Sequence, residues 1–298
     1  MAAWLAAASL RGISIAISPV LPLIKADLAL SYTEAGFLFA VPTLFMAVFG
    51  IPGGFLADNI GMKKTIVLGL TMLVTGSALR AVPGGLIPLV VWTALLGAGM
   101  GIANPGLTRM VKDRFPDLPG TATGIFASGF IVGATVASWL TFPYIVTLSG
   151  SWRGPFLIWS GYGLLALLVW VILVTEQGST GVKVRYLPEI WRDKTVWKLN
   201  IIFLMMNLSF YSMASWIPTY YSELGMDLES STQVLTIFVI TGLPSGLFIP
   251  LISDRFGARK WWVVISSGGF VPVFLAMLFF PMSAPLLIAT LMGLTVTG

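Results

Sequence analysis

The chemistry that this sequence can support depends first on one charge, Arg11, which lies in the middle of the apolar stretch from Ala2 to Ile24. A charged side chain at the centre of a bilayer costs about 2.5–3.5 kcal/mol on insertion scales, so it normally faces a cavity or a partner. A guanidinium binds planar anions through two parallel hydrogen bonds. Arg11 therefore predicts a site for an anionic or carboxylate-bearing substrate, unless its side chain extends to the membrane surface instead.

Other polar side chains have a spacing that would extend this site. Ser14 and Ser18 are four residues apart, and so are Asn207 and Tyr211. Helical residues with this spacing share one face. Trp216 suits an interfacial anchor and a gate equally well. The predicted substrate-binding residues are Arg11, Ser14, Ser18, Asn207, Tyr211 and Trp216.

Composition excludes many other kinds of chemistry. The 298 residues include no Cys and no His, so thiol nucleophiles, imidazole bases and zinc or haem sites built on these residues are ruled out. There is no Walker sequence and no acidic metal cluster, and Gly97, Gly99 and Gly101 suggest close helix packing rather than a phosphate cradle. We therefore expect no enzyme activity, no cofactor, no metal and no ATP-driven transport.

The chain is 57% hydrophobic and 10% charged, whereas a soluble domain has about 25% charged residues. The apolar runs have the length of membrane-spanning helices rather than of barrel strands, so the predicted fold class is an all-α multi-spanning membrane protein. The expected helices are residues 3–24, 35–57, 65–83, 86–110, 122–147, 153–174, 197–222, 232–252 and 261–281, with a tenth that begins near residue 284.

Basic residues fall mainly in alternate loops. The net charge of +5 is therefore interpreted as a topology signal and not as a sign of nucleic acid binding. Thirteen of the 17 Lys and Arg residues lie on one side, and only Lys25, Arg80 and Arg153 are expected in the opposite loops. The positive-inside rule then puts the amino terminus in the cytoplasm, in what we expect to be a bacterial inner membrane.

A polar stretch near the middle divides the chain. We expect a six-helix bundle over residues 1–175, a cytoplasmic linker over 176–196 and a partial second bundle over 197–298. Transporters are commonly built from two such halves. A large cytoplasmic loop without a repeat on either side is the alternative interpretation.

An internal repeat supports the two halves. Residues 54–64 align without a gap on residues 250–260, so that Asp58 matches Asp254 and Gly61 matches Gly257, each followed by paired cations. Glycine permits a tight turn between two helices, and the cations suit an anionic membrane surface. We expect each aspartate to accept hydrogen bonds from N–H groups at a helix amino terminus; the alternative is that it only shapes the turn.

This segment resembles the loop motif G-x-L-x-D-x-x-G-x-K/R-K/R of the major facilitator superfamily. Gly54, Leu56, Asp58, Gly61, Lys63 and Lys64 match the motif, whereas Asn59 and Met62 replace residues that are usually basic. The resemblance implies a fold of twelve helices, of which the last two would be missing here, and a loop that stabilises one conformation. The residues predicted to form this conformational motif are Gly54, Asp58, Gly61, Lys63, Lys64, Asp254, Arg255, Gly257 and Arg259.

Less specific motifs elsewhere in the sequence resemble those of cyanate-permease-like and nitroimidazole-resistance transporters within the superfamily. They include residues 10–12, 18–27, 101–105 and 112–116, together with Phe210-Tyr211-Ser212 and Trp216-Ile217-Pro218. The resemblance implies a secondary active transporter, expected to be a monomer in the lipid bilayer, that moves a small anion by alternating access. Efflux of a drug-like or nitroaromatic compound and a non-transporting receptor or scaffold are the alternatives.

Coupling to protons is left open by the sequence. The acidic residues fall in predicted turns or, for Glu34, at the outer start of the second helix. A proton relay would then have to use Glu34 or the substrate itself. The placement of the acidic residues is therefore compatible with proton-coupled uptake of an anion and with facilitated exchange.

Overall fold

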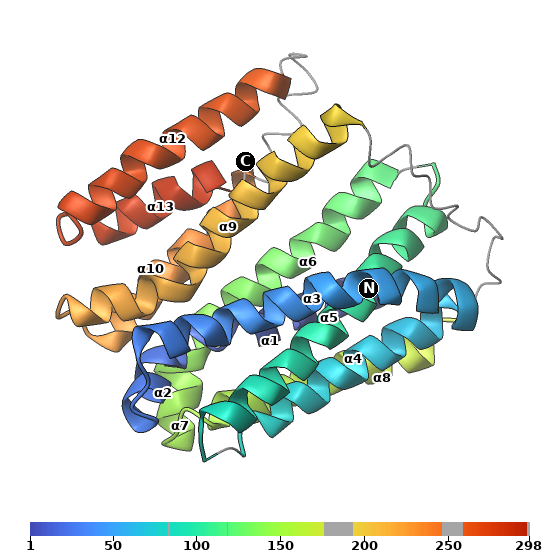
Figure 1. The fold of residues 1–298 in the computed structure, drawn as a ribbon, viewed down its shortest axis with the longest axis horizontal. Helices are drawn as coiled ribbons and strands as arrows, with labels where there is room; N and C mark the ends of the chain where they lie inside the picture. Colours follow the sequence, from blue (N-terminus) through green and yellow to red (C-terminus); the bar gives the residue numbers. More distant parts are fainter. Residues whose placement is uncertain (83, 118, 176–192, 246–258, 297–298) are drawn as a thin grey trace.

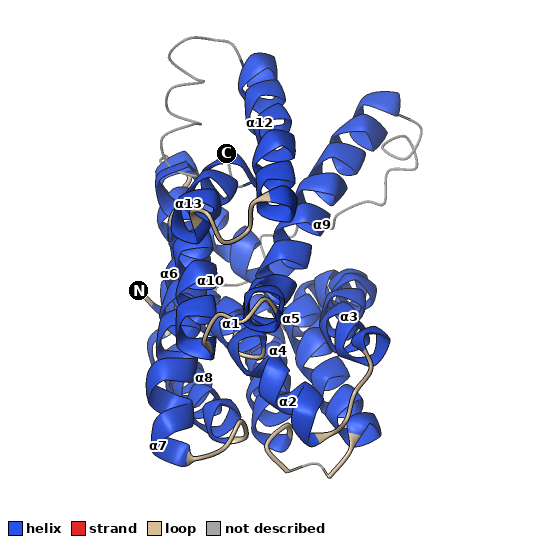
Figure 2. Ribbon diagram, turned by 90° about the vertical axis from the view of Figure 1, so that its left-hand side faces the viewer, coloured by secondary structure: helices blue, strands red, loops and turns tan. Residues whose placement is uncertain are grey.

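A computed structural model describes residues 1–82, 84–117, 119–175, 193–245 and 259–296. The described residues form helices joined by short turns, without a β-strand among them (Figure 2). Seven helical segments in this part of the chain are long and apolar enough to cross a membrane. The predicted all-α membrane fold is therefore confirmed.

The first seven expected spans correspond to described helices. The first half of the chain contains α1 (Ala2–Ile15), η1 (Ser18–Val20), α2 (Leu21–Asp27), α3 (Tyr32–Ile60), α4 (Met62–Leu79), α5 (Leu86–Arg114), α6 (Pro119–Leu140), η2 (Thr141–Val146), α7 (Thr147–Ser149) and α8 (Gly154–Leu173). The second half contains α9 (Lys194–Glu223), α10 (Leu228–Ile240), α12 (Arg259–Phe279) and α13 (Pro285–Val296). Helices α10, α12 and α13 correspond to the expected spans 232–252, 261–281 and 284 onward. Part of the first of these spans and the end of the chain lie outside the described residues.

Local signals set several helix ends. The Ser31 hydroxyl and the Glu34 carboxylate form a capping box at the start of α3. Asp227 caps α10 by accepting from the Ser230 backbone N–H, and this hydrogen bond holds the pKa of Asp227 below its ordinary value. Gly61 has φ +92°, a conformation that favours glycine, and it allows α4 to begin directly after α3.

The first membrane-spanning segment is broken, whereas the sequence predicted one helix over residues 3–24. The α-helix ends at Ile15, and a short 3-10 turn begins at Ser18. Pro19 explains the break, because its ring has no N–H and would clash with the carbonyl four residues earlier in a continuous helix. The rest of the segment consequently consists of two short helices, η1 and α2.

Glycines set the close packing of α5 against its neighbours. A Cβ on Gly97 would lie 2.4 Å from the carbonyl oxygen of Pro42 in α3, and a Cβ on Gly99 would lie 2.5 Å from the carbonyl oxygen of Gly69 in α4. Small residues let helices approach closely in lipid, where burial of apolar surface provides little driving force. The expected packing role of these glycines is confirmed.

Two groups of helices make up the molecule (Figure 1): α1 to α8 form one group, and α9, α10, α12 and α13 form the other. They meet at one end, where η1 and α2 contact α9, and along α6, which contacts α10. The first turns of α9, at the end where Gly61 lies, expose Trp197, Ile201 and Met205, whereas Ala214 and Ile217 farther along α9 are buried. We call these two ends the motif end and the opposite end.

We predict that Gly97→Ala lowers the stability of the protein by about 1–3 kcal/mol, because the new methyl group would overlap backbone atoms of α3 and force the helices apart. Gly161→Ala is the matched control, since a Cβ on Gly161 in α8 has open space around it. Thermal unfolding in detergent measures both variants. Equal melting temperatures for the two would contradict the close packing of α3 and α5.

Candidate functional site

A cavity of about 230 Å³ lies between the two groups of helices. Its walls come from α1 and α6 on one side and from α9, α10 and α13 on the other. Its lining holds one cation, one carboxamide and otherwise apolar side chains, without a carboxylate: Arg11, Phe130, Ile131, Ala134, Met206, Asn207, Phe210, Val239 and Val296. Such a cavity favours an anionic ligand, because its one full charge is positive.

The side chain of Arg11 connects the two groups of helices. Its guanidinium donates a hydrogen bond to the hydroxyl of Tyr211 in α9. It also lies 4.7 Å from the centres of the Phe210 and Tyr211 rings, which is within cation–π range. No carboxylate pairs with it among the described residues. Arg11 is therefore held by neutral groups at the cavity wall.

The structure brings together only part of the predicted substrate-binding set. Arg11, Asn207 and Tyr211 meet at the cavity. Ser14 and Ser18 do not line it, and the Ser18 hydroxyl is fully buried in η1 without a hydrogen-bond partner in the described chain. Trp216 lies nearer the opposite end, with its ring centre 6.3 Å from that of Tyr32 in α3.

Contacts at the opposite end join the two groups of helices. The Lys25 ammonium in α2 lies 2.9 Å from the Glu223 carboxylate at the end of α9, and 3.4 Å from the centre of the Tyr32 ring. Trp216 packs against the same tyrosine from α9. Of the two interpretations of Trp216, the contact across the two groups of helices favours a gate over an interfacial anchor. Sequence reasoning missed Lys25 and Glu223, although both stand at the predicted ends of the first and seventh helices.

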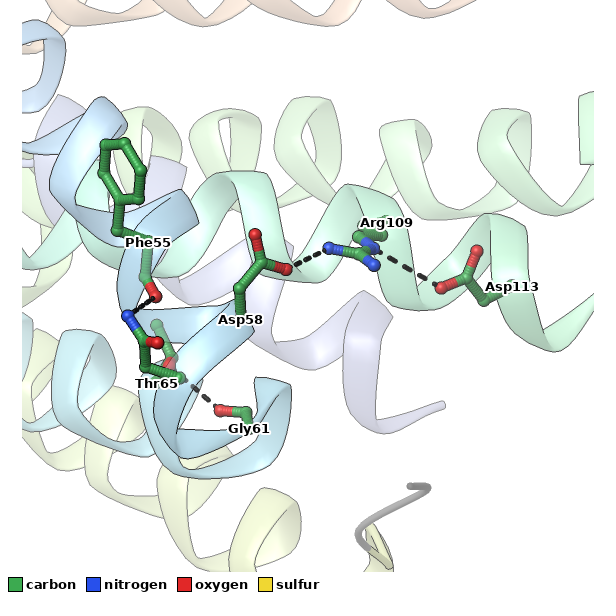
Figure 3. A network of polar contacts seen from close by, with 7 residues as sticks. Phe55, Asp58, Gly61, Thr65, Arg109 and Asp113 are labelled. Carbon is green, nitrogen blue, oxygen red and sulfur yellow. Dashed lines mark hydrogen bonds and ion pairs between the residues drawn. The ribbon is translucent and has the colours of Figure 1, made fainter. Parts of the chain in front are cut away.

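The aspartate of the loop motif contacts a different partner from the expected one (Figure 3). Asp58 Oδ1 accepts from Arg109 Nη1 in α5 at 2.7 Å, and the same guanidinium lies 3.7 Å from Asp113 Oδ2. The predicted acceptance from helix amino-terminal N–H groups is wrong for Asp58, because the hydrogen bond that it accepts comes from the Arg109 side chain. The spacing of Arg109 and Asp113, four residues apart at the end of a helix, is the sequence signal that was missed.

The remaining motif residues have separate roles. Lys63 Nζ donates to the carbonyl oxygen of Val171 near the end of α8 at 2.9 Å, and Lys64 is exposed. A Cβ on Gly54 would have open space, so this glycine is not required for close packing. In the second copy of the motif, Arg259 is the first residue of α12. Its other predicted members lie outside the described residues: Asp254, Arg255 and Gly257.

Arg80, which the sequence placed in a loop, is buried inside the first group of helices. It ends α4 with 1% of its surface exposed, and its Nη2 donates to the carbonyl oxygen of Ile13 at 3.2 Å. Its guanidinium carbon lies 4.4 Å from the centre of the Phe156 ring. Because the helix breaks after Ile15, the Ile13 carbonyl lacks the backbone N–H donor that a continuous helix would provide. The Arg80 guanidinium donates the hydrogen bond instead.

Two groups of membrane-spanning helices, with a cavity between them lined by one arginine, one asparagine and otherwise apolar side chains, are an arrangement found among membrane transporters. Comparison with known proteins gives the family. The Major Facilitator Superfamily profile matches residues 3–298, and the chain belongs to this family.

Known relatives lie at low to moderate identity. The chain is 30% identical to the uncharacterized transporter YycB of Bacillus subtilis over 248 residues, which are 83% of this chain and 61% of YycB. It is 22% identical to the cyanate transport protein CynX of Escherichia coli over 97% of this chain and 75% of CynX. It is 23% identical to the 2-nitroimidazole transporter of Escherichia coli over 89% of this chain and 69% of that protein. The predicted resemblance to cyanate and nitroimidazole transporters is confirmed at the level of relatives.

Solved structures share the fold. An inward-facing, unoccupied bacterial homolog of the human lysosomal transporter Spinster matches with a TM-score of 0.79 and 19% identity, over 99% of this chain and 72% of that one. The present chain thus spans between about three fifths and three quarters of the length of these proteins.

We predict that reversing the charge of Lys25 opens the contact between α2 and α9, because Lys25→Glu places two carboxylates together. The ion pair is partly exposed, so its loss contributes only about 0.2–1 kcal/mol, and repulsion adds to this. Spin labels on cysteines replacing Ala26 and Leu224, in a chain without native cysteine, report the distance. The distance should lengthen in Lys25→Glu and recover in the exchange variant Lys25→Glu, Glu223→Lys. No recovery would exclude a direct ion pair.

We also predict that Asp58 and Arg109 are energetically coupled by about 0.2–1 kcal/mol, since both side chains are partly exposed. Asp58→Asn and Arg109→Gln should each lower the melting temperature, and the double variant should be no worse than the more damaging single one. Additive losses would mean that the two side chains act separately. Lys64→Gln, at an exposed site near the same turn, is the control for a general loss of charge.

Proposed function

We propose that this protein is a secondary active transporter that moves a small anion through the cavity between its two bundles by alternating access. The observation that carries the proposal is Arg11, a cation in a membrane-spanning segment that lines the cavity and has neutral partners alone among the described residues. An anion would supply the countercharge that the described residues do not provide there. The name of the relative CynX, a cyanate transport protein, agrees with this ligand chemistry.

The size of the cavity supports a small substrate. Sites for drug-sized ligands have volumes of about 300–1,000 Å³, whereas this cavity has about 230 Å³. Asn207 offers a carboxamide on the wall opposite Arg11, and Tyr211 offers a hydroxyl that now accepts from Arg11. An anion that replaced Tyr211 as the acceptor would exchange a neutral hydrogen bond for a charge-assisted one.

The proposed cycle moves the two bundles relative to each other around this site. Residues 1–175 would form one bundle, residues 197–298 part of the other and residues 176–196 the linker. The motif end would face the cytoplasm, with the amino terminus inside and the protein in a bacterial inner membrane. In this orientation the contacts of Lys25, Tyr32 and Trp216 would lie on the outer side, which supports an inward-facing state.

Proton coupling, where it occurs, would depend on the substrate. The described cavity lining has no carboxylate, and Glu34 is bonded to Ser31 at the start of α3. A protonated anion could therefore carry its own proton through the cavity. We propose a monomer as the transporting unit, because the cavity forms within one chain.

Export of a nitroaromatic compound is the second candidate. Phe130 and Phe210 in the lining offer ring faces on which an aromatic substrate could stack. A nitro group carries partial negative charge on planar oxygens and would suit Arg11 as well. The two candidates are distinguished by measuring both the uptake of small anions and the export of nitroimidazole in vesicles that contain the complete protein.

We predict that Arg11→Ala weakens anion binding by roughly 30-fold or more, because a charge-assisted pair contributes about 2–5 kcal/mol when its partner is lost. Arg11→Lys should have a smaller effect, since it keeps the charge but loses the planar fork. Uptake of cyanate, nitrate and acetate by the complete protein in proteoliposomes measures the change.

Arg153→Lys, which alters an arginine outside the cavity, is the control for this experiment. Membrane insertion is checked separately for each variant. If Arg11→Ala transports anions as well as the parent protein, Arg11 is not the anion-binding residue and the anion proposal fails. If it loses nitroimidazole export instead, the second candidate gains the support.

A further inference from the structure

The substrate cavity described above offers few polar groups. Arg11 and Asn207 line it, and the Tyr211 hydroxyl accepts a hydrogen bond from Arg11. The remaining lining side chains are apolar and come from α6, α9, α10 and α13. The described walls thus combine one cation with a largely apolar surface, and a ligand that fills the cavity has to match both.

The charge of the lining favours a ligand with a single negative charge. Arg11 is the one charged side chain among the described residues of the lining. A second anionic group on the ligand would have to leave water for contact with side chains such as Ile131 and Val239. Burial of an ion without a partner in apolar surroundings is strongly unfavourable, so a dianion fits these walls poorly.

The volume of the cavity favours a ligand with an apolar body. The cavity volume of about 230 Å³ is several times the ~30 Å³ that one water molecule occupies in the liquid. A small inorganic anion at Arg11 would leave most of the apolar lining in contact with water. An anion that carries an apolar group would cover this lining, and the removal of apolar surface from water is favourable.

Two aromatic rings line the cavity, Phe130 from α6 and Phe210 from α9. The guanidinium carbon of Arg11 lies 4.7 Å from the centre of the Phe210 ring, so a carboxylate bound to Arg11 places the group that carries it beside this ring. Both rings are held by further aromatic contacts. Phe210 stacks on Phe238 with ring centres 5.5 Å apart, and Phe130 meets Phe126 edge to face at 5.2 Å. Flat rings pair well with such rings, by offset stacking or edge to face.

We propose that the substrate is a monocarboxylate carried on an aromatic ring, with the carboxylate on Arg11 and the ring on the apolar walls that include Phe130 and Phe210. This inference rests on the proposed function and narrows its substrate class. It separates the substrate from small inorganic anions, which leave the apolar walls uncovered. It also separates the substrate from dicarboxylates, whose second charge has no partner among the described lining residues.

The test is isothermal titration calorimetry of the complete protein in lipid nanodiscs at pH 7, where carboxylic acids are ionised. Benzoate is the probe. Acetate and nitrate lack its apolar body, terephthalate carries a second charge, and benzamide carries none. Benzoate should bind about ten-fold or more tightly than each of these, since a single methylene group in a hydrophobic pocket can already contribute this factor. Empty nanodiscs provide the blank for partition of the ligands into lipid.

Phe130→Leu tests the ring, because it removes an aromatic face and keeps the lining apolar. Benzoate is here compared with cyclohexanecarboxylate, which has the same charge on a saturated ring. The variant should weaken benzoate binding by about two- to ten-fold more than cyclohexanecarboxylate binding, as expected for the loss of one aromatic pair. Phe126→Leu is the matched control, since Phe126 lies one turn earlier on α6 and outside the lining. It should leave the ratio of the two affinities unchanged.

Some outcomes would overturn this inference and leave the proposed anion transport standing. They are acetate or nitrate bound as tightly as benzoate, terephthalate bound as tightly as benzoate, and the same ratio of affinities in Phe130→Leu and Phe126→Leu. Other outcomes would overturn the proposed function as well, because the cavity would then not recognise negative charge. They are benzamide bound as tightly as benzoate, benzoate binding undiminished in Arg11→Ala, and no binding of any of the anions.

Discussion

A positive charge placed within a membrane-spanning segment must find a favourable environment, and Arg11 finds it across the boundary between the two groups of helices. Its guanidinium lies against the rings of Phe210 and Tyr211 and donates to the Tyr211 hydroxyl. These partners are neutral, so they solvate the charge without neutralising it. The same arrangement therefore holds the two groups together and keeps a full positive charge available at the cavity wall.

The broken first segment makes this arrangement compatible with closure at the opposite end. Pro19 interrupts the helix, and Arg80 donates to the Ile13 carbonyl just before the break. A buried arginine is costly, and here it stabilises backbone geometry that a straight helix would not have. Arg11 lies before the break and Lys25 after it, so the same segment contacts α9 at the cavity and again at the end of α9.

The sequence predicted the features that depend on local pattern. Hydropathy predicted the spans, the motif predicted the Gly61 turn, and the four-residue spacing of Asn207 and Tyr211 correctly predicted that both lie at the cavity, where Tyr211 contacts Arg11. Ser18 fails as a cavity residue because Pro19 turns η1 away from the helical register on which the prediction relied. The Arg109–Asp58 and Lys25–Glu223 pairs join residues 51 and 198 positions apart, and helical periodicity carries no information about such distances.

The polar contacts between the two groups at the opposite end are individually weak, which agrees with the proposed alternating access. The Lys25–Glu223 pair is partly exposed and so contributes little. Nearby, the buried hydroxyls of Ser18 and Thr219 lack partners in the described chain, which makes the closed arrangement less favourable than full burial would suggest. Separation of η1 and α2 from α9 would let water reach such groups. If a substrate binds at Arg11 as proposed, weak polar contacts at this end would leave it less free energy to overcome in shifting the balance between conformations.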